Sequence, residues 1–258
     1  MMDKRAIALV TGGGGGIGAA CAHTLAQDHM VVVTDANGDA ADRVAQEIDG
    51  KAFACDVTSP ESVESLVAQI ETDIGPIEKL VHVAGIIQDR TFAPEEFEQE
   101  KWDKVQSVNV GGTWINCRAV GKRMATRGHG AIVNIASVAG HRSWPTHSYA
   151  ASKAAVLSLS RGLAVEWGRS GVRVNSVSPG FTMTPKLEEL IAVRNWDHTA
   201  IANQTALGRW VRPEEIADAV AFLLSDRASA ITGIDLPVDT GWLCGINWLS
   251  FEGVPASR

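Results

Sequence analysis

Seven short apolar runs recur along the chain, and each is followed by a longer segment with the spacing of a helix. The runs are rich in Val, Ile and Ala and do not alternate with polar residues. Continuous apolar runs of this length are typical of strands buried on both faces, as in a parallel sheet covered by helices. The predicted strands are AIALVTG at 6–12, VVVTD at 31–35, KAFACDV at 51–57, KLVHVAG at 79–85, GAIVNIAS at 130–137, VRVNSVSPG at 172–180 and DLPVDTG at 235–241.

This alternation predicts an α/β fold: a Rossmann-like, doubly wound parallel sheet of about seven strands, flanked by helices on both faces. The chain has 258 residues, and sheets flanked by helices often reach this length as one domain. It contains no internal repeat and no linker rich in Pro, Gly or Ser. We therefore expect a single domain over 1–258. The irregular segment 181–207 is expected to be a lid or substrate loop, with an ordinary exposed insertion as the alternative.

Composition narrows the class of partner. The net charge is −7 and 45% of the residues are hydrophobic, which speaks against a nucleic acid or an anionic membrane as partner and favours a small molecule. No apolar stretch is long enough for a signal peptide or a membrane span. The four cysteines, Cys21, Cys55, Cys117 and Cys244, are far apart and lack zinc-binding spacing. We expect buried thiols, a cytoplasmic location and no metal site.

A glycine-rich turn, TGGGGGIG at 11–18, follows the first predicted strand and precedes a helical pattern. Glycines suit a tight turn at which the backbone approaches a pyrophosphate and the helix N-terminus faces the anion. Two spacings fit the run: Gly13, Gly15 and Gly18 match G-x-G-x-x-G, and a wider spacing also fits. The glycines of that wider spacing, G-x-x-x-G-x-G, are Gly12, Gly16 and Gly18.

Two acidic residues lie at the carboxyl ends of predicted strands. Asp35 ends the second one, about 20 residues after the glycine run, where a carboxylate accepts hydrogen bonds from the adenosine ribose. It predicts NAD rather than NADP, because no Lys or Arg within 36–38 offsets the charge of a 2′-phosphate. Its alternative is a turn or capping role. Asp56 ends the third predicted strand, where it would meet the adenine edge or fill a turn.

Four polar residues form a candidate catalytic group. Tyr149, the only tyrosine, precedes Lys153 by one helical turn in SYAASK, so both lie on one helix face. A phenol with a pKa of ~10 needs a nearby cation to act as a base at neutral pH. Ser137 ends a predicted strand, and Asn109 lies in a predicted long helix. By spacing alone, Tyr149 also fits a core residue with a satisfied hydroxyl.

In combination, these motifs resemble the short-chain dehydrogenase/reductase family, in its NAD-preferring branch. The resemblance runs from the glycine-rich turn through Asp35, DV at 56–57, AG at 84–85, Asn109, Ser137, YAASK and PG at 179–180 to the closing VDTG. Each motif is common alone, but this order of them is highly specific.

The resemblance implies a role for each matching residue. Tyr149 would be the general acid–base, and Lys153 would lower its pKa and bind the nicotinamide ribose. Ser137 would orient the substrate oxygen, Asn109 would hold a proton-relay water, and Thr184 would contact the nicotinamide carboxamide. The implied cofactor-binding residues are Gly12, Gly15, Gly16, Ile17, Gly18, Asp35, Asp56, Val57, Ala84, Gly85, Tyr149, Lys153, Pro179, Gly180, Thr182 and Thr184.

The chain departs from the family at one motif. HVAG stands where NNAG is usual, so His82 and Val83 replace two asparagines. That puts in doubt the hydrogen bonds made there to the sheet and the adenosine side. Within a buried-looking strand, His82 fits a satisfied core histidine better than a catalyst.

The predicted reaction interconverts a secondary alcohol and a ketone by hydride transfer to or from NAD. Substrate identity is expected to depend on 86–90, 138–147 and 181–207. Their polar and aromatic residues predict a sugar, polyol or hydroxy-acid pocket, or else a solvated rim. The residues concerned are His141, Arg142, Trp144, His147, Arg194, Trp196 and His198.

Two other functions stay open. The first is a 3-oxoacyl-thioester (acyl-carrier-protein) reductase, which usually takes NADPH and is therefore opposed by Asp35. The second is a non-catalytic dinucleotide-binding regulator, which the intact catalytic group opposes. The tail at 240–258 carries Trp242, Trp248 and Phe251, which we expect to be buried against the substrate pocket or another subunit. The family resemblance favours a homotetramer.

Overall fold

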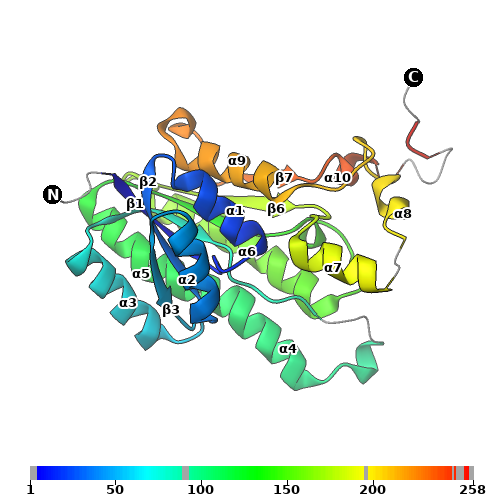
Figure 1. Ribbon diagram of the computed structural model, residues 1–258, viewed down its shortest axis with the longest axis horizontal. Coiled ribbons are helices and arrows are strands. Elements are labelled where there is room, and N and C mark those ends of the chain that lie inside the picture. The colour runs from blue at the N-terminus through cyan, green and yellow to red at the C-terminus, as the bar shows by residue number, and fades with distance from the viewer. Residues whose placement is uncertain (1–4, 89–92, 195–196, 246, 248–252, 256–258) are drawn as a thin grey trace.

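The computed structural model describes residues 5–88, 93–194, 197–245, 247 and 253–255. In this part of the chain, a seven-stranded sheet has the order β3-β2-β1-β4-β5-β6-β7, and all neighbouring strands are parallel (Figure 1). The strands are β1 (Ala6–Thr11), β2 (His29–Asp35), β3 (Lys51–Ala54), β4 (Ile77–His82), β5 (Gly130–Ile135), β6 (Val172–Pro179) and β7 (Asp235–Val238). The order changes direction between β1 and β4, the place where open sheets of this kind bind ligands.

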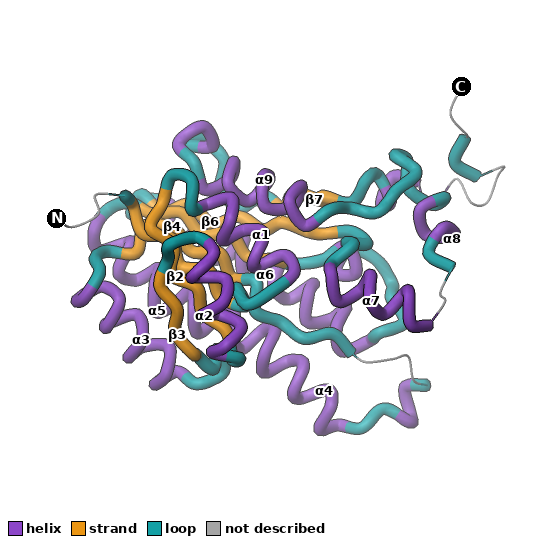
Figure 2. The backbone as a smooth tube through the Cα atoms, in the orientation of Figure 1, coloured by secondary structure: helices purple, strands orange, loops and turns teal. Residues whose placement is uncertain are grey.

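Helices cover both faces of the sheet (Figures 1 and 2). One face packs against α1 (Gly16–Leu25), α2 (Gly38–Glu47) and α9 (Pro213–Leu224). The other packs against α3 (Pro60–Asp73), α5 (Gly112–Arg127) and α6 (His147–Gly168). The remaining α-helices are α4 (Gln99–Gln106), α7 (Pro185–Arg194), α8 (Thr199–Ala202) and α10 (Trp242–Gly245). The predicted doubly wound α/β fold is confirmed.

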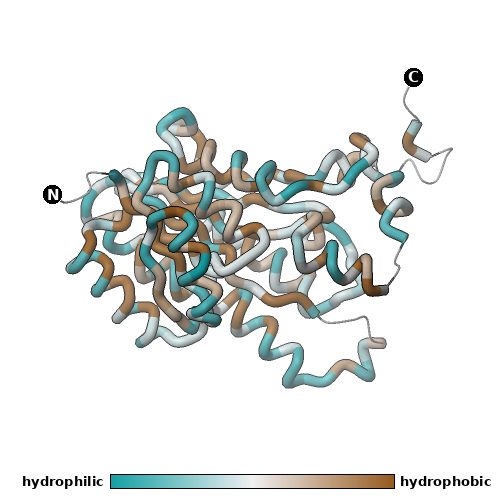
Figure 3. The backbone as a smooth tube through the Cα atoms, in the orientation of Figure 1, coloured by the Kyte–Doolittle hydropathy of each residue, from teal (hydrophilic) through white to brown (hydrophobic). Residues whose placement is uncertain are grey.

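The continuous apolar runs are strands buried on both faces of the sheet, as predicted. In β1, Ala8 and Val10 pack toward one helical layer, and Ile7 and Leu9 pack toward the other. Successive side chains of a strand point to opposite faces, so a strand covered on both sides is apolar over most of its length. The covering helices have one buried face, and α3 accordingly alternates between hydrophobic and polar along its length in Figure 3.

Several elements differ in their bounds from the sequence prediction, and three of these differences place candidate site residues. Strand β3 ends at Ala54, and Asp56 lies in the following turn, where its carboxylate accepts hydrogen bonds from Thr58. Strand β5 ends at Ile135, and Ser137 caps a 3-10 turn, η3 (Val138–Gly140). Asn109 lies in a π-helical stretch, η2 (Ser107–Gly111), between α4 and α5 rather than in one regular helix.

A polar row crosses the sheet near its carboxyl end. The strand register aligns Thr34, Thr11, His82, Asn134, Ser176 and Asp235 across six adjacent strands. The residues two positions earlier in β1, β2, β4, β5 and β6 pack in the core shared with α3, α5 and α6, so the row faces that layer too. The apolar core therefore gives way to hydrogen-bonding side chains just below the site.

Segment 181–207 leaves the sheet beyond β6. It begins with a bridge between Thr182 and Val211 and continues through α7 and α8. No helix in the described ranges combines the length and apolarity needed to cross a membrane. Nor does the described part of the chain hold a group of three or more His, Cys, Asp or Glu residues suited to a metal ion.

Candidate active site

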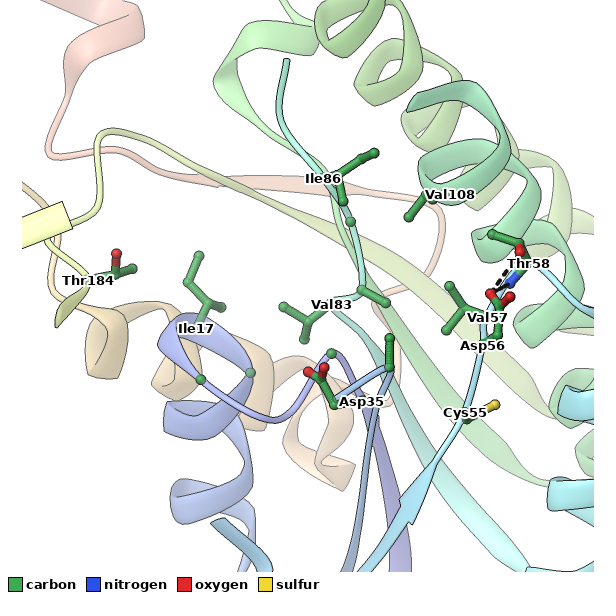
Figure 4. A pocket seen from close by; sticks show the side chains of 16 residues that line it. Ile17, Asp35, Cys55, Asp56, Val57, Thr58, Val83, Ile86, Val108 and Thr184 are labelled. Atoms are coloured by element: carbon green, nitrogen blue, oxygen red, sulfur yellow. Dashed lines mark hydrogen bonds between the residues drawn. The ribbon is translucent and has the colours of Figure 1, made fainter. Parts of the chain in front are cut away.

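A cavity of about 430 Å³ opens at the carboxyl ends of the first four strands (Figure 4). The sequence prediction placed a dinucleotide here, and ten predicted residues line the cavity: Gly12, Gly15, Ile17, Gly18, Asp35, Asp56, Val57, Ala84, Gly85 and Thr184. Six lining residues were missed: Ala36, Cys55, Thr58, Val83, Ile86 and Val108. Three of the missed residues, Ala36, Cys55 and Val83, directly follow strand ends, and that position was the signal available in the sequence.

The glycine-rich turn uses the wider of the two candidate spacings. Gly12 and Gly16 have φ of +65° and +52°, a region that favours glycine. A Cβ on Gly12 would lie 2.7 Å from the backbone of Ala84, and one on Gly18 would lie 2.0 Å from the carbonyl oxygen of Gly12. Gly15, by contrast, has an extended backbone and open space around it. The backbone thus requires glycine at 12, 16 and 18, as in G-x-x-x-G-x-G.

Asp35 ends β2 beside this turn. Its Oδ2 accepts a hydrogen bond from the Gly14 amide at 3.1 Å, and its Oδ1 accepts one from the Asn37 amide at 3.0 Å. Ionised carboxylate oxygens have several lone-pair sites, so both can still accept hydroxyl protons from the cavity.

One nearby cation was missed by the sequence analysis. Arg43 of α2 donates from Nη2 to the Gly14 carbonyl at 2.9 Å, and its Nη1 lies 3.4 Å from Oε1 of Glu47. Residues 36–38 hold no cation, but helix α2 brings Arg43 back toward the turn. Its carboxylate partner Glu47 offsets part of its charge.

Asp56 adopts the turn role that the sequence left open. Its Oδ1 accepts hydrogen bonds from the amide and the hydroxyl of Thr58 at 2.9 and 2.7 Å, and these bonds lower the pKa of the carboxyl group. It also lines the cavity, so its predicted contact with the adenine edge stays a prediction.

Tyr149 and Lys153 lie one turn apart near the start of α6, as predicted. The Lys153 Nζ lies 5.7 Å from the centre of the Tyr149 ring and donates to the Ile135 carbonyl at 2.8 Å. Lys153 is 5% exposed. Burial lowers the pKa of its ammonium group to about 8.

The Ser137 Oγ accepts a hydrogen bond from the Ala139 amide at 3.1 Å, and the Ser137 side chain lies close enough to the Tyr149 phenol for a hydrogen bond to influence its pKa. Burial raises the pKa of the Tyr149 phenol, and the bond to Ser137 opposes that rise. The net direction differs from the lowering expected from Lys153. The ammonium group instead bonds to Ile135, and burial outweighs the other influences on the phenol.

Asn109 holds the chain after β4 against α6. Its Oδ1 accepts from the Ile86 amide at 2.8 Å, and its Nδ2 donates to the Ile86 carbonyl and the Ser152 hydroxyl, each at 2.9 Å. The π-helical stretch that carries it is a feature often found at functional sites. A water held by Asn109 stays a prediction.

His82 is buried, as expected, but only one side of its ring is bonded. Its Nδ1 lies 2.9 Å from the Thr11 hydroxyl, and its Nε2 has no hydrogen-bond partner among the described residues. Burial, and secondarily the charge of Lys153, lowers its pKa to about 3. The ring is therefore neutral, which agrees with a core histidine, although it is not the fully satisfied one expected.

The other predicted cofactor residues lie around the cavity rather than in its lining. Pro179 ends β6, and the Gly180 amide donates to the Val238 carbonyl at 2.9 Å. A Cβ on Gly180 would meet the Cα of Asp239 at 2.7 Å. The Thr182 hydroxyl donates to the Gly180 carbonyl at 3.0 Å. Gly16, Tyr149 and Lys153 also lie outside the cavity lining.

An aromatic cluster lies beyond the ends of β5, β6 and β7. Trp144 contacts Phe181 and Trp242 at ring-centre distances of 5.7 and 5.2 Å, and Phe181 contacts Trp210 at 5.5 Å. Trp242 is buried, as expected for the tail. Trp248 and Phe251, also expected to be buried, lie outside the described residues.

The residues predicted to line the substrate pocket lie in different surroundings, and in the described part of the chain none of their hydrogen bonds or ring contacts joins two of them. Arg142 donates to the Leu243 carbonyl at 3.2 Å, and His147 is an exposed first residue of α6. The His198 ring lies 6.3 Å from that of Trp210. Arg90, Trp196 and the Arg194 side chain lie outside the described residues.

The sequence family that matches this chain is named as a reductase, and two similar relatives are named as dehydrogenases. The sequence family described as Enoyl-(Acyl carrier protein) reductase matches residues 13–243. D-threitol dehydrogenase from Mycolicibacterium smegmatis is 39% identical over 246 residues, covering 92% of each chain. Galactitol 2-dehydrogenase (L-tagatose-forming) from Cereibacter sphaeroides is 40% identical over 249 residues, covering 92% of this chain and 94% of the relative.

Solved structures share the fold over nearly the whole chain. A crystal structure named as ribose-5-phosphate isomerase from Brucella melitensis 16M has a TM-score of 0.94 at 46% identity and covers 99% of both chains. A variant actinorhodin polyketide ketoreductase with NADPH has a TM-score of 0.87 at 31% identity, covering 94% of this chain and 99% of that chain.

The fold and the site thus define a dinucleotide-binding α/β protein with a Ser–Tyr–Lys group beside the cavity. Together with these matches, they show that the chain belongs to the short-chain dehydrogenase/reductase family of oxidoreductases.

Proposed function

We propose that the protein is an NAD(H)-dependent dehydrogenase that interconverts a secondary alcohol and a ketone, with a polyol or sugar as the alcohol. The observation that carries the proposal is the placement of Tyr149 one helical turn from Lys153, whose Nζ lies 5.7 Å from the ring centre, with Ser137 close by and a cavity with a glycine cradle beside them. The relatives that oxidise threitol and galactitol support the polyol class.

The residues around the cavity fit a dinucleotide. Gly12 and Gly18 leave no space for a Cβ, as a close-packed pyrophosphate turn requires, and the N-terminus of α1 follows them. When bound, the nicotinamide supplies hydride chemistry. Asp35 would accept the ribose hydroxyls, and its charge supports NAD over NADP. Arg43, bonded to the turn and close to Glu47, does not offset that charge through a direct contact with Asp35.

The chain's own residues handle the proton. In oxidation, Ser137 orients the alcohol oxygen and the Tyr149 oxygen accepts the hydroxyl proton; reduction reverses these roles. Lys153 holds a positive charge near the ring and stabilises the phenolate that forms. Asn109 fixes the backbone of Ile86 at the cavity wall.

The test is a fluorescence titration with NADH and NADPH, followed by turnover of threitol, galactitol, hydroxy acids and acetoacetyl thioester. We expect tighter NADH binding, polyol turnover, and at least ~100-fold loss of kcat in Tyr149→Phe with retained NADH binding. Tyr149→Phe removes only the hydroxyl group, so retained NADH binding in this variant serves as the control for an intact structure.

Other outcomes would contradict specific parts of the proposal. NADPH preference would overturn the role of Asp35. Turnover of acetoacetyl thioester would identify a 3-oxoacyl-thioester, not a polyol, as the substrate. NADH binding without any turnover would indicate a regulator. Isomerisation of ribose 5-phosphate without NAD would favour the activity in the name of the Brucella structure.

The assembly and location are also proposals. The face of α5 and α6 supports the homotetramer, because it exposes Trp114 and Val165. Cys21, Cys55 and Cys117 are buried free thiols, which supports the reducing cytoplasm as the location. Cys244, which was also expected to be buried, is exposed because it lies in the short helix α10 of the tail. Segment 181–207 is proposed to close over the substrate.

A further inference from the structure

His141 reaches from the end of one strand to the far edge of the sheet. It follows the 3-10 turn after β5, and its Nε2 lies 2.9 Å from Oδ2 of Asp235 at the start of β7. The same nitrogen lies 3.1 Å from the Ser178 hydroxyl of β6. The contact thus joins the turn after β5 to the last part of β6 and to the first residue of β7.

Asp235 depends on this contact. Its side chain is 5% exposed, and its Oδ1 accepts from Ser176 at 2.7 Å and from Ser178 at 3.0 Å. A carboxylate withdrawn from water is stable only when its oxygens are hydrogen-bonded. The imidazole of His141, itself 25% exposed, contacts Oδ2, so the pair joins a partly exposed histidine to a carboxylate that is largely withdrawn from water.

His141 directly follows the 3-10 turn that Ser137 begins. The Gly140 amide donates to the Ser137 carbonyl at 2.9 Å, and the His141 amide donates to the Val138 carbonyl at 3.1 Å. His141 and Ser137 are therefore the two ends of one small hydrogen-bonded unit. A shift of the imidazole would be transmitted to Ser137.

The opposite side of the same turn packs on α6. A Cβ on Gly140 would lie 2.9 Å from backbone atoms of Lys153 and Ala154. The turn is held between α6, which carries Tyr149 and Lys153, and β7, which carries Asp235. Without its anchor on β7, the turn would lose the support of its far end and keep the packing on α6 and the bond from the Ala136 amide to the Val177 carbonyl of β6 at 2.8 Å.

We propose that the pair of His141 and Asp235 positions Ser137 against Tyr149 and the substrate oxygen. His141 is then a positioning residue, which acts through Ser137 and does not touch the substrate. The inference rests on the proposed function, because that function gives Ser137 its role in the reaction.

The test compares two replacements of His141. His141→Leu removes the donor to Asp235, and His141→Gln retains a donating nitrogen at similar reach. We expect kcat to fall about 10- to 100-fold in His141→Leu, since small misplacements near the reacting atoms have effects of this size. His141→Gln should restore kcat to within about threefold of wild type, and neither change should alter NADH affinity. His129→Leu, an exposed histidine after α5, is the control.

A second comparison separates positioning from general loss of structure. In a Ser137→Ala background, His141→Leu should cause no further fall in kcat, because the residue through which it acts is already absent. Asp235→Asn keeps the serine contacts and should lower kcat in the same direction. Equal losses in the Ser137→Ala and wild-type backgrounds would overturn the inference, as would unchanged kcat in both His141→Leu and Asp235→Asn.

The two proposals fail differently. Turnover retained in Tyr149→Phe would contradict the proposed function itself. An inactive Tyr149→Phe variant beside a fully active His141→Leu variant would contradict the positioning role only.

Discussion

Lys153 carries its charge in a place where charge is costly. Burial lowers its pKa from 10.5 to about 8, so some of its ammonium form is lost just above neutral pH in the folded protein. The unfolded chain keeps the higher value and binds more protons between these two pKa values. By linkage, the free energy of unfolding therefore rises with pH in that window.

Lys153→Met should reveal this cost. Below pH 8 the wild type bears the desolvation cost of the ammonium group and the Met variant does not, so the variant is relatively more stable there. Between pH 8 and 10.5 that advantage should shrink by up to about 3 kcal/mol, taking roughly 1.4 kcal/mol for each pKa unit. Urea unfolding across this pH range measures the difference. The exposed Lys51→Met is the control, and parallel curves for Lys153→Met and wild type would contradict the predicted burial of charge.

The same substitution should remove activity, since Lys153 is proposed to stabilise the phenolate of Tyr149. Residues that lower stability and serve function are expected at an active site. His82 belongs with Lys153 here, because its neutral ring lies in the polar row below the lysine and leaves Nε2 without a partner among the described residues.

At the scale of elements, the glycine-rich turn fixes how α1 meets β1 and β4. The close approach is between backbones: Gly18 packs on Gly12, and Gly12 packs on Ala84. Sequence alone offered two glycine spacings, because five consecutive glycines satisfy both. Only backbone conformation and contacts distinguish them, which is why the helix start was predictable and the register was not.

Gly18→Ala and Gly15→Ala form a matched pair for this element. The Cβ of Gly18→Ala would lie 2.0 Å from the Gly12 carbonyl oxygen, so we expect a loss of roughly 1–3 kcal/mol in stability and weaker NADH binding. The Cβ of Gly15→Ala meets no protein atom within 4 Å, and its midpoint of thermal unfolding should match the wild type. Calorimetry measures both midpoints. A wild-type midpoint in Gly18→Ala would contradict the prediction, because it would mean that the turn can move to accommodate the Cβ.

Local spacing explains which parts of the site were predictable from sequence. Tyr149 and Lys153 are four residues apart on one helix, and Asp35 ends a strand, so simple periodicity places them. The π-helical stretch at Asn109 has no such signature. Arg43 and the pair of His141 and Asp235 are brought into place by helix packing and strand register, which join residues far apart in the chain.

At the scale of the whole molecule, the doubly wound parallel sheet could be predicted because parallel strands with helical crossovers have few arrangements. The external surface is less constrained. Helices α5 and α6 pack closely where the Trp167 ring covers Gly121. Beside this contact a hollow of about 520 Å³ is lined by Trp114, Leu159 and Trp167. Trp114 is 43% exposed and Val165 is 84% exposed.

Large exposed apolar side chains on neighbouring helices are typical of an interface, so we predict that Trp114→Glu combined with Val165→Glu disrupts the tetramer. Each carboxylate would have to be buried without a partner at the contact, which is strongly unfavourable. Size-exclusion chromatography with light scattering should show a tetramer for wild type and a smaller species for the double variant. Val193→Glu, at an exposed position on α7, should leave the mass unchanged. A monomeric wild type would contradict the assembly, and a tetrameric double variant would move the interface away from α5 and α6.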